Sequence, residues 1–316
     1  MTVSKPPSRS RRLKRAVFHG LLALVPLRAR VGLTRRFFPQ LRRYLPHGRE
    51  ITVDGYLGRF RVVLDMTYPV EREMLVNWYE PDAVAVIDAL VRDGDTCFDI
   101  GANVGALTLA MARRVGAAGR VYAFEPGPLT YPRLARNIAL NPSIRGRVVT
   151  LQLGVADKPG TLYWNEEPDN RGNATLLRPS GAPVRVVSID GHFATEPLQR
   201  LTLVKIDVEG MEYEVLAGGR ATWFAHQPVI YLETLRDFES ARGFPVLERV
   251  EALLRDMGYA LFRVDEDRRL RAVSAATAAM YTLAVPLRRS DLLDGARLPG
   301  APARPRRPAP TFVART

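Results

Sequence analysis

Short runs of β-branched and aromatic residues alternate with helical patterns of apolar positions along the middle of the chain. Strand-like runs cover residues 96–100, 120–124, 148–156, 201–207, 228–233, 259–264 and 281–285. Helical patterns cover 107–115, 129–140, 211–217 and 246–257. Alternation on this scale is typical of a parallel sheet with helices on both faces. The pattern therefore predicts an α/β fold around a mostly parallel seven-stranded sheet.

Two segments depart from this alternation. Residues 51–65 alternate around Gly55 and Gly58, which predicts a hairpin, and helical patterns follow at 71–79 and 82–91. Between the halves of the sheet, an insert at 157–195 is rich in Gly, Pro and Asn and contains the short strand-like pieces TLYW, ATLL and VRVVSI. Long irregular segments in such folds tend to be functional, so we expect the insert to form a lid or a wall for the substrate.

The chain divides into four expected regions. These are a basic, partly helical extension (1–49), a hairpin with helices that cap the site (50–92), the main domain (93–290) and a disordered Pro- and Arg-rich tail (291–316). The division follows the change from alternating elements to segments that have little to bury.

The net charge of +13 belongs to the two ends of the chain. Residues 1–49 hold 13 Lys and Arg and no acid, and 296–316 hold 5 Arg and no acid, so 50–295 hold 28 basic against 33 acidic residues. A slightly acidic body does not suit a phosphate backbone, and we expect no nucleic-acid partner. The basic amino-terminal segment would suit a weak contact with an anionic membrane surface.

Cysteine and histidine usage excludes two classes of scaffold. Cys97 is the single cysteine, and the four histidines show no zinc-ligand spacing, so we expect neither a disulfide nor a metal site. The longest mostly apolar stretch, 16–27, is too short to cross a bilayer, and arginines follow it where a cleavage site needs small residues. We therefore expect a cytoplasmic location.

The segment Asp99-Ile-Gly101-Ala-Asn103-Val-Gly105 lies where the first strand of the sheet turns into a helix. In an open parallel sheet, ligands bind beyond the carboxyl ends of the strands. Glycine lets a ligand lie against the backbone, because a Cβ would collide with it. A dinucleotide places its pyrophosphate at this helix terminus, whereas the aspartate here would repel phosphate and attract an ammonium group. The loop favours a ligand with a cationic amino-acid end.

Four more acidic residues lie at or just beyond the ends of three later strands. Glu125 ends the second strand, where a carboxylate can accept both hydroxyls of a ribose. Asp157 follows the third, either near an adenine amino group or as an ordinary turn residue. On the fourth, Lys205 and Asp207 share one side of the strand and Glu209 lies just beyond its end. Lys205 and Asp207 either pair with each other or form the edge of a ligand pocket.

Together these motifs resemble the FkbM family of S-adenosylmethionine-dependent methyltransferases, which have the class I, Rossmann-like methyltransferase fold. The resemblance covers about residues 71–233. It includes DIGANVG, FEP, LGVADKPGTL, GNATL, VSID and KIDVEGMEYEVLAGG. The specific part is KIDVEG in register with DIGANVG, since either motif alone is a weak signal.

The resemblance implies S-adenosylmethionine as cofactor and a role for each motif residue. Asp99, Gly101, Asn103 and Gly105 would line the methionine side, Glu125 would hold the ribose, Asp157 would lie near the adenine, and Asp207 to Glu209 would close the site. The acceptor implied is a hydroxyl on a sugar or on a glycosylated or polyketide small molecule.

Methyl transfer to a hydroxyl also needs a group to take its proton, and two rival functions stay open. Asp207 and Glu209 are the first candidates for the base, ahead of Glu233 and His192. A nicotinamide-dependent oxidoreductase shares the strand, the Gly-rich loop and the ribose carboxylate. An adaptor that binds nucleic acid or membrane through its Arg-rich ends would keep the fold only as a scaffold.

Overall fold

A computed structural model describes residues 48, 50–75, 77, 79–167, 170–175, 181–196, 198–234, 243–265, 268–275 and 280–289. The expected extension at 1–49, apart from Gly48, and the expected tail at 291–316 lie outside the described residues. Within those ranges no helix is both long and apolar enough to cross a membrane.

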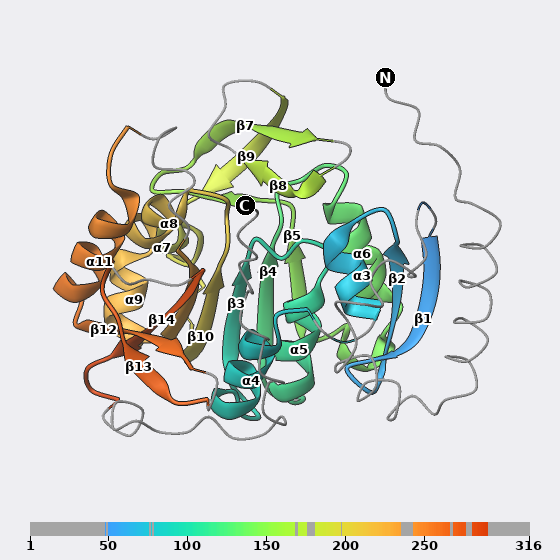
Figure 1. The fold of residues 1–316 in the computed structure, drawn as a ribbon, viewed down its shortest axis with the longest axis horizontal. Coiled ribbons are helices and arrows are strands. Elements are labelled where there is room, and N and C mark those ends of the chain that lie inside the picture. The colour runs from blue at the N-terminus through green and yellow to red at the C-terminus, as the bar shows by residue number, and fades with distance from the viewer. Residues whose placement is uncertain are drawn as a thin grey trace, which may run out of the picture.

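Eight strands form the central sheet (Figure 1). Their order is β13 (Leu270–Ala272), β12 (Tyr259–Val264), β14 (Tyr281–Pro286), β11 (Val229–Glu233), β10 (Leu201–Ile206), β3 (Thr96–Ile100), β4 (Arg120–Phe124) and β5 (Val148–Leu151). The strands β11, β10, β3, β4 and β5 run parallel to one another. Strand β14 is antiparallel to both of its neighbours, β11 and β12. The α/β fold around a mostly parallel sheet that the sequence predicts is confirmed, with one strand more than the predicted seven. The added strand, β13, has three residues and extends the edge beyond β12.

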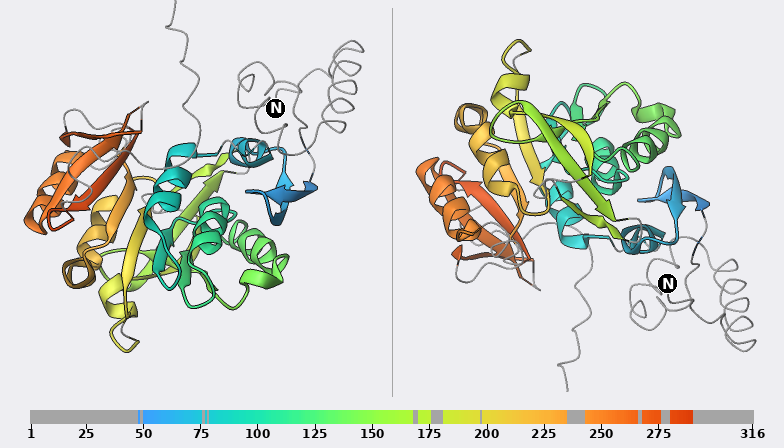
Figure 2. Two further views of the ribbon diagram at one scale, coloured as in Figure 1. Left: turned by 90° about the horizontal axis from the view of Figure 1, so that it is seen from below. Right: turned by 90° about the horizontal axis from the view of Figure 1, so that it is seen from above.

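Helices cover both faces of this sheet (Figure 2). On one face lie α4 (Pro81–Leu90), α5 (Ala106–Arg114) and α6 (Tyr131–Ala139), and on the other α7 (Ile189–His192), α8 (Glu212–Gly218), α9 (Arg220–His226) and α11 (Val246–Asp256). Cys97 of β3 packs in the first core and the next residue, Phe98, in the second. Every residue of β10 is buried, as expected for a strand with both faces covered.

A second, four-stranded sheet lies near the carboxyl ends of the central strands (Figure 1). Its order is β6 (Gly154–Val155), β9 (Ala182–Val187), β7 (Gly160–Glu167) and β8 (Asn170–Thr175). It accounts for most of the insert. The run 148–156 was predicted as one strand, but it divides into β5 and β6, because its last residues pair with β9 rather than continuing along β4.

Two helices differ from the sequence prediction. Ile189, expected in a strand, begins α7, which Ser188 caps by accepting a hydrogen bond from the backbone N–H of Gly191 at 3.2 Å. Helix α9 was not predicted. It follows α8 after a break at Gly219, where a Cβ would collide with the indole ring of the fully buried Trp223.

The hairpin of β1 (Glu50–Tyr56) and β2 (Phe60–Asp65) stands apart from the central sheet, followed by α3 (Pro69–Leu75). After α6 comes a short 3-10 helix, η2 (Pro142–Ile144).

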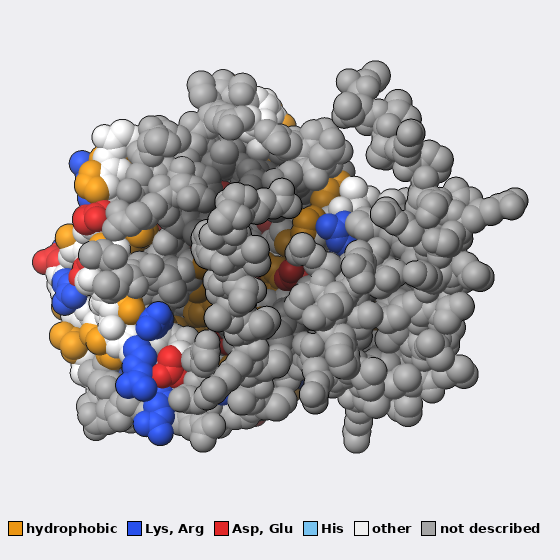
Figure 3. Space-filling view, in the orientation of Figure 1, with side chains coloured by type: hydrophobic (Ala, Val, Ile, Leu, Met, Phe, Trp, Pro, Cys, Tyr) orange, Lys and Arg blue, Asp and Glu red, His pale blue; other side chains and the backbone are white. Residues whose placement is uncertain are grey.

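On the side of the molecule opposite the hairpin, Figure 3 shows Lys and Arg side chains gathered over β12 and β13, where Arg263, Arg269 and Arg271 are exposed. Charges at a sheet edge discourage pairing with another chain.

Candidate active site

An open cavity lies at the carboxyl ends of β3, β4, β10 and β11. The strand order reverses between β3 and β10, and a crevice at such a point is where open α/β sheets bind ligands. The hairpin and helix segment adds Tyr68, Glu71 and Tyr79 to the wall, and β7 of the insert adds Trp164. Trp78, the neighbour of Tyr79 in the sequence, lies outside the described residues.

The loop after β3 forms the floor of the cavity through Gly101 and Asn103. Gly101 has a φ of 80°, and a Cβ there would collide with the backbone carbonyl oxygen of Asp207. Its N–H donates to the carbonyl oxygen of Phe124 at 3.0 Å, which ties the loop to β4. Asn103 is also left-handed, with a φ of 49°. Glycine at position 101 is therefore needed for close contact between the β3 and β10 ends.

Glu125 is oriented by two backbone amides. Its Oε2 accepts a hydrogen bond from the N–H of Asn103 at 2.9 Å, and its Oε1 accepts one from the N–H of Gly127 at 2.8 Å. The side chain is 4% exposed and lines the cavity. Each carboxylate oxygen can accept more than one hydrogen bond, so a rigidly held Glu125 can still bind two adjacent hydroxyls.

Asp99 and Gly105 do not line the cavity, although the sequence analysis expected both to do so. Asp99 is 1% exposed; its Oδ2 accepts a hydrogen bond from Thr108 Oγ1 at 2.5 Å, and its Oδ1 lies 3.8 Å from Lys205 Nζ. Burial raises its pKa, and the ammonium of Lys205 opposes that rise. Gly105 begins α5 with a φ of 94°, and a Cβ there would approach Leu134 Cδ1 to 2.9 Å. Both residues support the loop from behind.

Two other candidates from the sequence lie away from the cavity. Asp157 is exposed and lines a separate depression with Glu214 and Met211. The structure therefore does not bring Asp157 to the cavity wall. His192 packs edge-to-face against Phe124 and Phe193 on α7, and burial lowers its pKa. An imidazole in that position does not reach the cavity.

Lys205 connects the β10 end to the loop after β3. Its Nζ donates to the carbonyl oxygen of Gly101 at 2.7 Å and lies 3.3 Å from Asp207 Oδ2. Burial lowers the pKa of Lys205, but the carboxylates of Asp207 and Asp99 outweigh it and raise the pKa above its usual range. The pairing that the sequence left open is present, and Asp207 also lines the cavity.

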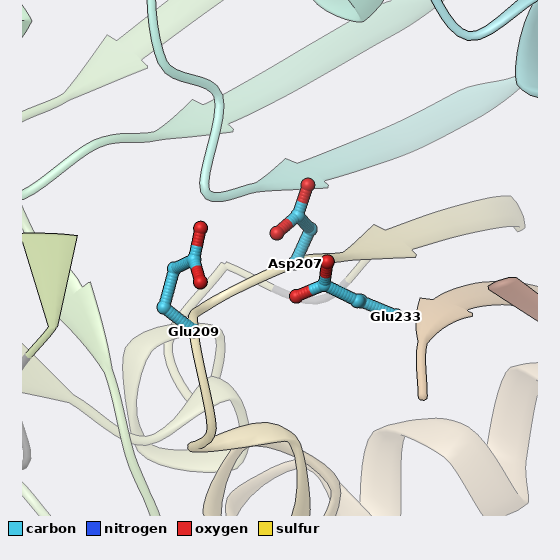
Figure 4. Close-up of side chains that lie close together, drawn as sticks. All are labelled: Asp207, Glu209 and Glu233. Atoms are coloured by element: carbon cyan, nitrogen blue, oxygen red, sulfur yellow. The ribbon is translucent and has the colours of Figure 1, made fainter. Parts of the chain in front are cut away.

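Asp207, Glu209 and Glu233 bring their carboxylates together at the cavity (Figure 4). One oxygen of each lies within 4.8 Å of the others. Burial, followed by the charge of Asp207, raises the pKa of Glu209 to about 8 and that of Glu233 to about 10. The sequence placed Asp207 and Glu209 together, and it named Glu233 only as a lesser candidate for the base.

Sequence reasoning missed several residues of the cavity wall. Glu71 of α3 and Arg133 of α6 form a bidentate ion pair, at 2.6 and 2.5 Å, and both line the cavity. Tyr281, at the start of β14, donates from its hydroxyl to Glu80 Oε1 at 3.1 Å. No local pattern marks these residues, because only the fold brings their elements together.

Comparisons with known proteins agree with this arrangement. Residues 99–261 match the methyltransferase FkbM domain family. The methyltransferase sdnD of Sordaria araneosa is 31% identical over 199 residues, covering 52% of this chain and 73% of that protein. The 31-O-demethyl-FK506 methyltransferase FkbM of Streptomyces tacrolimicus is 30% identical over 203 residues, covering 54% and 74%. The hexuronic acid methyltransferase AglP of Haloferax volcanii is 27% identical over 169 residues, covering 52% and 66%.

Among solved structures, a methyltransferase FkbM from Methylobacillus flagellatus aligns with a TM-score of 0.40 and 13% identity, over 68% of this chain and 54% of that one. The family match spans the loop after β3, Glu125 and the cluster of carboxylates after β10 and β11. The chain therefore belongs to the FkbM methyltransferase family.

Proposed function

We propose that this protein transfers a methyl group from S-adenosylmethionine to a hydroxyl of a small molecule, either a sugar or a glycosylated or polyketide compound. The observation that carries the proposal is Glu125, fixed by two backbone amides beside Gly101 at the point where strand order reverses. A carboxylate held in that way suits the vicinal hydroxyls of a ribose.

The charges around the cavity favour a cationic ligand over a diphosphate. Carboxylates of Glu125, Asp207, Glu209 and Glu233 all line it, and Arg133 is paired with Glu71. A diphosphate would approach the carboxylates of Glu125 and Asp207, whereas a sulfonium with an ammonium end would be attracted to them. This distinguishes the proposal from a nicotinamide-dependent oxidoreductase.

The acceptor class rests on the relatives. One is described as acting on a hexuronic acid and another on 31-O-demethyl-FK506. The cavity has Tyr68, Tyr79 and Trp164 on its wall, and aromatic faces of this kind suit the apolar faces of sugars and macrocycles. A hydroxyl on such a compound is the acceptor that we propose.

The residues of the chain would bind and align the two reactants and receive one proton. Bound S-adenosylmethionine would supply an electrophilic methyl group in an in-line displacement. Glu125 would hold the ribose, and the backbone of Gly101 and Asn103 would support the methionine part. Alignment of the two reactants in this way accounts for much of the rate acceleration of a displacement reaction. Asp207 and Glu209 line the cavity, and we propose them as the groups that would take the hydroxyl proton.

The test is a transfer assay on the full chain. The protein is incubated with methyl-labelled S-adenosylmethionine and a panel of uronic acid glycosides and hydroxylated macrocycles, and products are read by mass spectrometry for the gain of one methylene. Asp207→Asn should lower turnover more than it lowers affinity for S-adenosylhomocysteine. Binding of NADH without any binding of S-adenosylhomocysteine would reject the proposal in favour of an oxidoreductase.

A further inference from the structure

The carboxylates of Asp207, Glu209 and Glu233 converge from two neighbouring strand ends. Asp207 follows β10 directly, Glu209 lies two residues later with a φ of 53°, and Glu233 is the last residue of β11. Figure 4 shows the three side chains directed toward one another. The left-handed backbone at Glu209 is strained for a residue with a side chain, and it turns the loop at the cavity.

Glu233 gives a second, independent observation. The residue is 8% exposed, and its Oε2 is fully buried with no hydrogen-bond partner among the described residues. Buried polar atoms nearly always have a partner, because an unpartnered one loses the hydrogen bonds that it makes with water. Figure 4 shows the side chain of Glu233 directed toward Asp207 and Glu209, and one of its carboxylate oxygens lies within 4.8 Å of an oxygen of each.

Two basic side chains near the cavity also have partners outside the cluster. Lys205 is the cation that pairs with Asp207, and it is shared with Asp99 and directed to the carbonyl oxygen of Gly101. Arg133 is committed to Glu71 across the cavity. A cation bound by all three carboxylates would reduce the repulsion among them.

The ligand set has the chemistry of a hard cation site. Three carboxylate oxygens within 4.8 Å of one another can reach one ion, since oxygen ligands lie about 2.0–2.6 Å from Mg²⁺ or Ca²⁺. Carboxylate oxygens favour Mg²⁺ and Mn²⁺ over the softer metals that histidine and cysteine bind. The sequence analysis expected no metal because it considered only histidine and cysteine spacing.

We propose that Asp207, Glu209 and Glu233 bind one divalent cation, Mg²⁺ or Mn²⁺, at the ends of β10 and β11. The site opens to the cavity, so further positions on the ion are accessible to a ligand there. If the proposed function holds, the acceptor hydroxyl would occupy one of these positions, and coordination would make its proton easier to remove. Binding of the cation itself does not depend on that function.

The test is a titration of the full chain with Mn²⁺, with free Mn²⁺ measured by electron paramagnetic resonance. We expect one Mn²⁺ per chain, displaced by Mg²⁺, and at least a tenfold loss of affinity in Glu233→Gln. Glu209→Gln should show the same loss of Mn²⁺ affinity. Because Glu209 lies at a half-buried loop position, this variant decides the test if Glu233→Gln does not fold. Glu214→Gln is the matched control, because Glu214 lies on α8 outside the cluster; its affinity should equal that of the unmodified chain.

Two outcomes would overturn the proposal. One is the absence of Mn²⁺ binding up to millimolar concentration, and the other is an affinity that both cluster variants leave unchanged. Calorimetric titration of the same sample with S-adenosylhomocysteine distinguishes a failure of the cation site from a failure of the proposed function. Binding of the nucleoside without Mn²⁺ rejects only the cation site, and binding of Mn²⁺ without the nucleoside rejects only the cofactor assignment.

Discussion

At the scale of single residues, the site depends on groups that are held in place before any ligand arrives. Glu125 has both oxygens bound to backbone amides, and Gly101 allows the β3 and β10 ends to touch. Side chains locked in this way bind without losing much rotamer freedom. Asp99 and Lys205, buried below the loop, contribute by fixing its position rather than by contacting the cavity.

Replacing Glu125 with alanine should weaken binding of S-adenosylhomocysteine by about 1–3 kcal/mol, because hydrogen bonds to a charged group are lost. Isothermal titration calorimetry measures the change, and Glu214→Ala serves as a control at a carboxylate away from the cavity. Equal affinities of Glu125→Ala and the unmodified chain would remove Glu125 from the ribose role.

Cys97 offers a probe of global unfolding. Its thiol is fully buried, and burial followed by the charge of Asp95 raises its pKa, so both access and the thiolate form are suppressed. We expect reaction with a thiol reagent such as DTNB to be at least about 10³-fold slower in the native protein than in urea, given a typical domain stability. A native rate within tenfold of the unfolded rate would show that β3 is not the closed core strand described above.

At the scale of elements, helix α6 completes the edge of strand β2. Asn137 accepts a hydrogen bond from the N–H of Val63 at 2.8 Å and donates to the carbonyl oxygen of Val104 at 3.0 Å. One turn later, Asn141 accepts from the N–H of Arg61 at 2.9 Å and donates to its carbonyl oxygen at 2.8 Å. The side-chain amides of Asn137 and Asn141 thus take the place of a partner strand for β2. They hold the hairpin, and the α3 helix that follows it, beside the cavity.

Asn137→Ala should lower the free energy of unfolding by about 2–4 kcal/mol, because a buried N–H and a buried carbonyl lose their partner. Urea denaturation followed by circular dichroism measures this loss. Arg136→Ala, on the same helix, removes only an exposed ion pair with Glu50 and should cost less than about 1 kcal/mol. If the two variants were equally stable, the hairpin would be held by apolar packing alone.

At the scale of the whole molecule, local patterns were sufficient for seven strands of the central sheet and for several residues at their ends. Hydrophobic alternation located the strands, and the motifs at their ends located Gly101, Glu125 and Asp207. Contacts between distant segments were beyond that reasoning. Glu71 and Arg133 are 62 positions apart, and Glu80 and Tyr281 are 201 apart, so only tertiary packing joins them.

The same limit explains why Asp99 and Asp157 do not line the cavity. Asp99 was placed on the ligand side because it precedes glycines, but strand alternation directs it to the buried Lys205. Asp157 follows the third strand in the sequence, but that strand ends early and the chain passes to a second sheet. In both cases the next element in space, rather than the local motif, determined where the side chain lies.

The most direct test of the account is a crystal structure of the full chain with S-adenosylhomocysteine. The account predicts the ligand in the cavity between the β3 and β10 ends, with both ribose hydroxyls within hydrogen-bond distance of the Glu125 carboxylate and the sulfur facing Asp207 and Glu209. A nucleoside bound elsewhere on the protein, with this cavity vacant or filled by side chains, would contradict it.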